Sequence, residues 1–406
     1  MEDDMEHKVK GGIASCYKEH IQEEVMPFWD ARCIDKEYGG YLTCFDREGN
    51  LTDDNKYGWF QGRQLYVYSL LYNKVEQKEE WLFNARHGYE FLVKHVYAGN
   101  GRWNYMLDRK GRVLSGTVSI FSDFHILHGI AEYLKMEGER DRVGLELLNT
   151  CFDVMEQNMF NPEFKEIYEN TWSPKFIWHD MYLTCLATTE TCAEVLGIER
   201  TQRLLRECVD KIENWFARDE YQVIFEAVTR DNKIDLETDK GRFVNPGHMH
   251  ESAWFCMKAG KMLADEAIVE RGIELVRWAN RVGKDKVHGG IISYADALGN
   301  IPTPIDWFKE TNSLWDEKVW WPNAEALAAY AIAYQCSGDE FYLQEFLEQS
   351  DYCRKNFYDV QYGEWYERLE YDGRVKNSDK GTPWKCAFHL VRALVFVWEA
   401  FNELEE

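Results

Sequence analysis

Two kinds of hydrophobic pattern alternate along this chain. Apolar residues at helical spacing fill longer stretches, such as residues 8–28 and the segment from about Trp59 through Leu71. Between these stretches lie short alternating segments around glycine-containing turns, which predict a β-hairpin over 35–50 and a copy over 101–113. Weaker copies are expected at 221–232, 288–294 and 362–373, and a degenerate one at 165–169.

The spacing of the hairpins predicts the fold. Successive copies lie roughly 55 to 75 residues apart, which leaves room for two helices of ordinary length between them. Six units of helix, hairpin and helix account for residues 1–406 with no linker-like segment left over. We therefore predict an all-α protein, a single (α/α)6-barrel domain with short β-hairpins at one end. An open helical solenoid is the alternative, but helix starts rich in aromatic and charged residues favour the closed form, whose mouth needs a polar pocket.

Composition narrows the class of protein. Hydrophobic residues make up 45% of the 406 residues and charged residues 29%, as in a soluble globular protein. Aromatic residues reach 15%, which suits a carbohydrate-lined cleft, because sugar rings present flat C–H faces, and equally suits a dense helical core. The net charge of -24 repels phosphate backbones and anionic lipid, so a nucleic-acid or membrane partner is not expected.

The cysteines and the N-terminal residues indicate in which cellular compartment the protein is expected. The 11 cysteines are an odd number without CxxC pairs, and those in apolar surroundings are typical of reduced core thiols. The chain starts with acidic residues rather than a basic and then apolar segment, and its apolar runs are too short to span a membrane. We expect a cytoplasmic protein.

Residues 244–255 form the stretch with the most candidate chemistry. A Pro-Gly pair precedes His248 and is poorly tolerated inside a helix, so a helix is predicted to begin near His248. His248, Glu251 and Phe255 then share one face. The dipole at a helix N-terminus favours a neutral imidazole, which can act as a base near neutral pH. The alternative is a capped helix with surface histidines.

Metal binding is a second use for the same stretch. His248, His250 and Glu251 stand at spacings that point their side chains to different helix faces, unlike the zinc helix His-Glu-x-x-His. We therefore predict no metal site.

Three further helix starts carry charged residues in apolar surroundings. Arg63 must be paired if buried, so it either faces a substrate oxygen or forms a structural ion pair. Glu325 is the acid of an Ala-rich helix and follows two tryptophans that suggest a pocket wall. His389, with Arg392 one turn further on, has a setting that matches that of His248.

Three other histidines are weaker candidates. His125 and His128, which open another helix, are expected to be packing or surface residues, and His179 is only a weak candidate for the cleft.

Four separated motifs resemble the N-acylglucosamine 2-epimerase family, which includes the animal renin-binding protein. They are residues 56–64, residues 245–248 with Glu251 and Trp254, residues 320–322 with Glu325, and residues 383–386 with His389. The resemblance runs from 27–29 to 392 and implies an (α/α)6 barrel, often a homodimer, that interconverts N-acetylglucosamine and N-acetylmannosamine.

The same resemblance implies roles for single residues. His248 and His389 match the paired acid/base histidines, and Arg63, Glu251, Glu325 and Trp384 match site residues. We also expect Trp321 and Arg392 to bind substrate. No cofactor is required, although some members are activated allosterically by ATP without consuming it.

The chain departs from the family pattern at two positions. Residue 323 is Asn where the animal relatives tend to carry His, and His250 is not a general feature. Relatives of the same fold act on free mannose, glucose or cellobiose, but the Asn-Pro-Gly-His motif favours the N-acyl sugar branch.

The implied chemistry is an inversion at C2 of an open-chain sugar. One histidine removes the proton alpha to the C1 carbonyl and the other returns one to the opposite face, while Arg63 stabilises the enediolate oxygen. A glycoside hydrolase or lyase of the same toroid class, using Glu251 and Glu325, is the alternative enzyme. A non-catalytic binding protein is a third possibility, against which the retained histidine pair argues.

Overall fold

The computed structural model describes residues 12–138, 141–168, 175–305, 309 and 313–404. Its contacts divide the chain into two compact units, each assembled from segments that are distant in the sequence. Unit 1 takes in Met1–Phe28, Val209–Ser378 and His389–Glu406, and unit 2 takes in Trp29–Cys208 and Asp379–Phe388. We describe each unit by itself, and the single domain over 1–406 stays a prediction.

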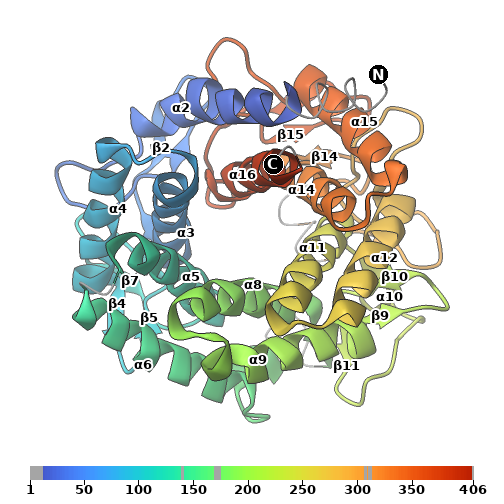
Figure 1. Ribbon diagram of the computed structural model, residues 1–406, viewed down its shortest axis with the longest axis horizontal. Coiled ribbons are helices and arrows are strands. Elements are labelled where there is room, and N and C mark those ends of the chain that lie inside the picture. Colours follow the sequence, from blue (N-terminus) through green and yellow to red (C-terminus); the bar gives the residue numbers. More distant parts are fainter. Residues whose placement is uncertain (1–11, 139–140, 169–174, 306–308, 310–312, 405–406) are drawn as a thin grey trace. The chain divides into compact units, whose positions relative to one another are not determined.

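Three mostly buried helices form the centre of unit 2. Helix α3 packs against α5, and α5 packs against α8, while α4 covers α3 and α6 covers α5 (Figure 1). The helices of this unit are α3 (Gly58–Leu70), η2 (Leu71–Val75), α4 (Glu79–Phe91), η3 (Leu92–Val96), α5 (Ile120–Glu137), α6 (Arg142–Met159), α7 (Lys165–Tyr168) and α8 (His179–Leu196), together with parts of α2 (Met26–Asp30) and α9 (Ile198–Lys211).

The strands of unit 2 are short and antiparallel. The pairs β1–β2 and β6–β7 confirm the hairpins predicted near 35–50 and 101–113. The degenerate copy expected at 165–169 is wrong, because Lys165–Tyr168 forms helix α7 and residue 169 lies outside the described residues. The strands are β1 (Cys44–Phe45), β2 (Leu51–Asp53), β3 (Lys56–Tyr57), β4 (Tyr97–Gly99), β5 (Arg102–Trp103), β6 (Met106–Leu107), β7 (Val113–Ser115) and β8 (Phe176–Trp178).

Unit 1 repeats this arrangement. Helix α11 packs against α12 and α14, and α15 packs on α14. Its helices are η1 (His20–Val25), η5 (Ile212–Phe216), α10 (Asp239–Arg242), α11 (Pro246–Leu263), α12 (Glu266–Gly283), α14 (Trp320–Ser337), α15 (Glu340–Asn356) and nearly all of α16 (Phe388–Glu403). Its strands are β9 (Ala217–Arg218), β10 (Val223–Ile224), β11 (Ala227–Thr229), β12 (Phe243–Val244), β13 (Ala295–Asp296), β14 (Lys318–Val319), β15 (Arg368–Leu369) and β16 (Val375–Asn377).

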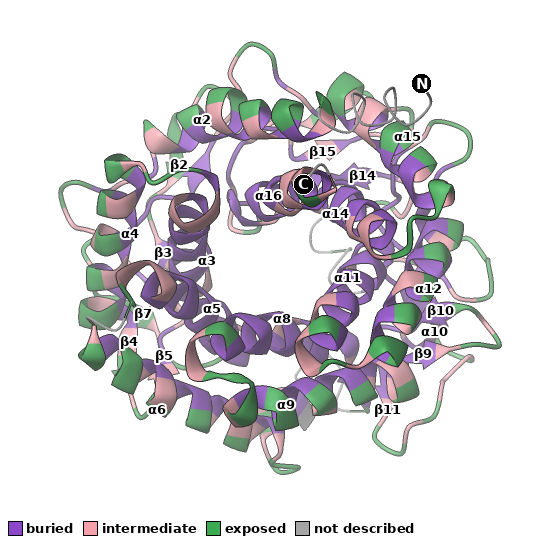
Figure 2. Cartoon of the chain, viewed as in Figure 1, coloured by how far each residue is buried: buried purple, intermediate pink, exposed green. Residues whose placement is uncertain are grey.

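The sequence explains which helices are buried. Helix α14 is apolar on every face and is buried along most of its length, whereas α12 has one apolar face and exposes the other (Figure 2). A helix that is apolar all round must be enclosed, and an amphipathic one covers it. Among the residues that the structure describes, none of the helices combines the length and the apolar character that crossing a membrane requires.

A buried lysine–aspartate pair precedes one helix in each unit. In unit 2, Lys56 donates to Asp35 over 2.8 Å, two residues before α3 begins. In unit 1, Lys318 donates to Asp285 over 2.5 Å, two residues before α14 begins. Both aspartates also accept hydrogen bonds from backbone N–H groups of their own turn, which satisfies the buried carboxylates.

A side-chain amide then joins each helix to the chain that follows this turn. The amide of Gln61 exchanges two hydrogen bonds with the backbone of Tyr41, and the amide of Asn323 exchanges two with the backbone of Ile291. In each pair the amide imitates a neighbouring strand. This gives the asparagine at position 323 a structural role.

Glycines allow α3 and α5 to approach closely in unit 2. A Cβ atom on Gly62 would lie 2.5 Å from both the carbonyl oxygen of His125 and the Cα of Ile126, and a Cβ on Gly129 would meet the carbonyl oxygen of Gly62. Backbone atoms cannot move aside as a flexible side chain can. The contact therefore requires glycine at both positions.

Gly62→Ala should therefore destabilise the protein. Since the added methyl group must push two helix backbones apart, we expect the free energy of unfolding to fall by about 1–3 kcal/mol. Urea denaturation measures this change. The control is Gly116→Ala, whose Cβ would meet only the Asn104 amide oxygen at 3.8 Å. Equal stability of the two variants would contradict the close approach.

Candidate active site

The start of α11 is built to present His248. The side-chain oxygen of Asn245 accepts hydrogen bonds from the N–H groups of Gly247 and His248, and Pro246 occupies the first turn, where its missing N–H costs nothing. A Cβ on Gly247 would lie 2.5 Å from the ring of Trp321, so glycine lets the indole lie against the helix start. The helix begins at Pro246, close to the predicted position.

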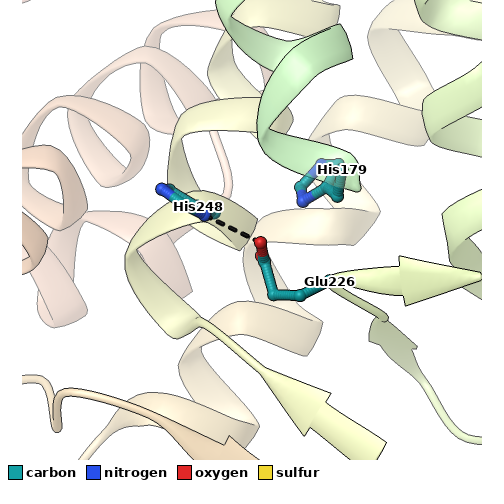
Figure 3. Close-up of side chains that lie close together, drawn as sticks. All are labelled: His179, Glu226 and His248. Atoms are coloured by element: carbon teal, nitrogen blue, oxygen red, sulfur yellow. Dashed lines mark hydrogen bonds and ion pairs between the residues drawn. The ribbon is translucent and has the colours of Figure 1, made fainter. Parts of the chain in front are cut away.

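A buried glutamate holds the His248 ring. The Nδ1 atom of His248 lies 3.0 Å from a carboxylate oxygen of Glu226 (Figure 3). The Glu226 N–H donates to the carbonyl oxygen of Phe243 over 3.1 Å, which fixes the glutamate beside the strand that leads into α11. Since a carboxylate only accepts hydrogen bonds, Nδ1 carries the proton, and the lone pair of the neutral ring is on Nε2.

His389 has a carboxylate partner of the same kind. Its Nδ1 atom lies 2.8 Å from Glu325, which also accepts a hydrogen bond from the indole N–H of Trp254 over 3.2 Å. One guanidinium nitrogen of Arg392 donates to Glu325 over 2.5 Å and to Glu251 as well. Two buried carboxylates thus share one buried cation, which offsets the cost of their desolvation.

Trp321 is a neighbour of both imidazoles. The centroid of its ring lies 5.1 Å from that of His248 and 5.4 Å from that of His389. Two histidines from distant parts of the sequence therefore lie on the same indole, and the Nδ1 atom of each faces a buried carboxylate. The structure brings six predicted site residues together in unit 1: His248, Glu251, Trp321, Glu325, His389 and Arg392.

The two other predicted site residues belong to unit 2. Arg63 lies on α3, with its guanidinium carbon 4.8 Å from the ring centroid of Trp59, and it donates to His125 over 3.0 Å. Trp384 packs edge-on against Trp59 with ring centroids 5.7 Å apart, and 41% of Trp384 is exposed. An exposed indole of this kind offers a flat apolar surface.

The three weaker histidine candidates are all buried in unit 2. His128 packs on the ring of Tyr66, with centroids 4.1 Å apart, which agrees with a packing role. His179 is the first residue of α8. His125 is also buried, but its hydrogen bond to Arg63 was not expected.

Sequence reasoning missed Glu226. The signal was present, because Glu226 interrupts the apolar run Val223–Val228, and a charged residue there must find a partner when it is buried. The hairpin pattern alone does not identify that partner as His248, which lies 22 residues further along the chain.

The residues considered for a metal have other partners. His248 faces Glu226, and the Nδ1 atom of His250 lies 2.7 Å from the carbonyl oxygen of Pro246. Glu251, Glu325 and His389 do bring ligand atoms within 4.8 Å of one another. The guanidinium of Arg392 bonds both of these carboxylates and so supplies the positive charge that a metal ion would otherwise bring.

His250 should make stability depend on pH. Burial lowers the pKa of His250 from 6.5 to about 4. Below pH 6.5 the unfolded chain therefore takes up a proton that the folded one resists, so stability falls until the pH reaches about 4 and this contribution then levels off. His250→Leu should lose less stability between these limits, by about 1.4 kcal/mol per pH unit at most. Urea denaturation at several pH values measures the difference, and parallel curves for the two proteins would contradict it.

Comparison with known proteins identifies the family. The profile of N-acylglucosamine 2-epimerase (GlcNAc 2-epimerase) matches residues 40–393. The chain is 30% identical to the N-acylglucosamine 2-epimerase of Mus musculus, over 96% of this chain and 92% of that protein. It is 23% identical to the cellobiose 2-epimerase of Dictyoglomus turgidum (strain DSM 6724 / Z-1310), over 91% and 94%.

A solved structure shows the fold. Cellobiose 2-epimerase from Bacillus thermoamylovorans B4167 superimposes with a TM-score of 0.82 at 20% identity, covering 96% of this chain and 99% of that one. The predicted fold class, an all-α (α/α)6 barrel with short β-hairpins, is confirmed by this likeness. The match over most of the chain and the extent of the identity to the mouse protein lead to one conclusion: this chain belongs to the N-acylglucosamine 2-epimerase family, a family of sugar isomerases.

Proposed function

We propose that the protein interconverts N-acetyl-D-glucosamine and N-acetyl-D-mannosamine by moving a proton at C2. The observation that carries this proposal is the pair of histidines on Trp321. His248 and His389 each keep Nδ1 on a buried carboxylate, and each neutral ring therefore has its basic lone pair on Nε2. An inversion at one carbon needs two such rings in different protonation states, because a neutral Nε2 removes a proton from one face and a protonated Nε2 supplies one to the other.

The reaction is balanced by these two groups alone. The sugar ring first opens, since only the open chain has the C1 carbonyl that acidifies the proton on C2. One neutral imidazole takes this proton on Nε2, and the electron pair moves onto the C1 oxygen to give an enolate, since C2 of an N-acetylated sugar carries nitrogen rather than oxygen. The other imidazolium then returns a proton to the opposite face of C2, which restores the carbonyl and leaves the configuration inverted.

The remaining predicted residues receive supporting roles in this proposal. Arg63 stabilises the negative charge of the enolate oxygen on C1, as a guanidinium near a developing oxyanion can. Glu325, held by Arg392, keeps the ring of His389 in one orientation, and Glu251 shares that arginine. Trp321 and Trp384 offer indole faces to the apolar side of a sugar.

The choice of an N-acyl sugar rests on the relatives. The mouse protein at 30% identity is an N-acylglucosamine 2-epimerase, and the cellobiose 2-epimerase of Dictyoglomus turgidum has 23% identity. Action on free mannose, glucose or cellobiose is the second candidate within the same chemistry.

A hydrolase that uses Glu251 and Glu325 has less support. Both carboxylates bond the same nitrogen of Arg392, and their ligand atoms lie within 4.8 Å of each other. An inverting hydrolase needs roughly 6.5–9.5 Å between its carboxyl groups to admit a water molecule, and an arginine between them blocks the approach of a glycosidic bond.

The proposal also covers the cofactor requirement, the oligomeric state and the location of the enzyme in the cell. Proton transfer between imidazoles and carbon calls for no redox group, so we propose that the reaction requires no cofactor. Activation by ATP and a homodimeric state are proposed from the resemblance, and a cytoplasmic location from the cysteines and the acidic N-terminal residues. Rate measurements with and without the nucleotide, and a sedimentation run, test the first two.

Exchange of the C2 proton with deuterated water distinguishes the roles of the two histidines. In deuterated water the unsubstituted protein should place deuterium at C2 of both sugars. His389→Asn leaves His248 able to exchange the C2 proton of one epimer, and His248→Asn should exchange only the other epimer. Each variant should lose epimerisation by at least about 10²-fold, and proton NMR follows both reactions.

The matched control is His288→Asn, an exposed histidine of unit 1 that packs on Tyr371. It should epimerise at the normal rate. If both active-site variants exchanged the same epimer, or if either retained normal turnover, the paired mechanism would be wrong.

Glu226→Gln removes the negative charge of this side chain while it keeps the shape. The amide can still accept a hydrogen bond from His248, but the imidazolium loses the carboxylate that stabilises it. We expect kcat to fall about tenfold to a hundredfold and the pH profile of kcat/KM to move to lower pH. Glu220→Gln, at an exposed position in the turn between β9 and β10, is the control. A normal rate and an unmoved profile in Glu226→Gln would contradict this role.

A further inference from the structure

Arg63 and His125 are held together by the helix packing of unit 2. They lie on α3 and α5, which approach at Gly62, the residue directly before Arg63. A Cβ on Gly62 would lie 2.5 Å from the carbonyl oxygen of His125 itself. The closest approach of the two backbones is therefore at the level of this pair, and the rigid contact fixes the separation of the two side chains.

The hydrogen bond between Arg63 and His125 determines which nitrogen of the imidazole carries the proton. The Nη2 atom of Arg63 lies 3.0 Å from the Nε2 atom of His125. Because a guanidinium only donates hydrogen bonds, Nε2 must be the acceptor, and His125 is then neutral with its proton on Nδ1. A protonated ring would present a donor to a donor.

Aromatic rings surround the same two side chains. The guanidinium carbon of Arg63 lies 4.8 Å from the ring centroid of Trp59 and 5.0 Å from that of Phe388. The ring of His125 packs edge-on against Phe388, with centroids 5.7 Å apart. Arg63 is 8% exposed and His125 is 5% exposed. In such surroundings a hydrogen bond to the cation is stronger than it is in water, and its loss is more costly.

We propose that His125 is the positioning residue for Arg63, a role that goes beyond packing. A neutral imidazole orients the guanidinium through one hydrogen bond and leaves its positive charge intact. A carboxylate in the same place would orient it equally well but would cancel much of that charge. The inference rests on the proposed function, in which Arg63 stabilises an enolate oxygen and needs its full charge for that.

Three substitutions at position 125 separate acceptor, charge and packing. His125→Gln keeps an uncharged acceptor and should retain kcat within a few-fold. His125→Phe keeps a ring but removes the acceptor, and kcat should fall about tenfold or more, as expected when a buried hydrogen bond to a charged group is lost. His125→Glu keeps an acceptor but adds a negative charge, and kcat should fall at least as far.

The split between kcat and KM distinguishes positioning from folding. Arg63 acts on a charge that develops after the sugar binds, so we expect KM to change much less than kcat in the Phe and Glu variants. The matched control is His128→Phe, one turn further on α5, where the ring packs on Tyr66. It should lower the melting temperature as much as His125→Phe does and should leave kcat near normal.

A double-mutant cycle tests the contact without relying on activity. If the hydrogen bond exists, Arg63→Met and His125→Phe should not be additive in the free energy of unfolding measured in urea. Additive effects would overturn the pairing.

The outcomes also separate this inference from the proposed function. If the unsubstituted protein epimerises none of a panel of N-acetylated and free sugars, both fail. If it epimerises one of them and His125→Phe keeps normal kcat, or His125→Glu is as active as His125→Gln, only the role of His125 is overturned.

Discussion

The geometry of the site in unit 1 depends on one shared cation. Glu251 and Glu325 are both buried, and two unpaired carboxylates so close together would repel each other and would each lose their hydration. Arg392 bonds both of them and places one positive charge between them, which offsets this repulsion. Glu325 faces the Nδ1 atom of His389 with one oxygen and accepts the indole N–H of Trp254 with the other. It thereby holds the imidazole in the tautomer whose lone pair is on Nε2. Without the arginine, the two carboxylates would lose the group that positions both of them, and the orientation of His389 would no longer be defined.

The repeated helices and hairpins could be predicted because both signals are local. Apolar residues at intervals of three and four specify a buried helix such as α3, and glycine-containing turns between alternating residues specify a hairpin such as β6–β7. The same reasoning fails at 165–169, where Lys165–Tyr168 forms α7. A segment of five residues is too short to distinguish a period of two from one of 3.6, so its neighbours decide its structure.

The partners of the site residues could be predicted less well, because they depend on contacts between elements. The sequence singles out His248 and His389 by their apolar surroundings, but it does not reveal that Glu226 lies against the first. That pairing depends on a backbone hydrogen bond between Glu226 and Phe243, which lie 17 residues apart in the sequence. The hydrogen bond between His125 and Arg63 could not be predicted for the same reason, since it joins two helices that approach closely at glycines.

The two units share one arrangement of hydrogen bonds at a helix start, but it carries an arginine in unit 2 and a glutamate in unit 1. Arg63 follows Lys56 by seven residues, and Glu325 follows Lys318 by seven residues. In each case the lysine pairs with an aspartate before the helix, and an amide two residues before the functional side chain bonds to the backbone after the aspartate's turn. These hydrogen bonds thus fix the position of the side chain on its helix, whereas the residue type at that position determines whether the charge is positive or negative. What distinguishes the copies is the partner: Arg63 bonds a neutral imidazole, whereas Glu325 bonds a guanidinium and an imidazole. The chemistry of this family member is therefore set by the residues that meet these two positions, and the fold supplies the positions.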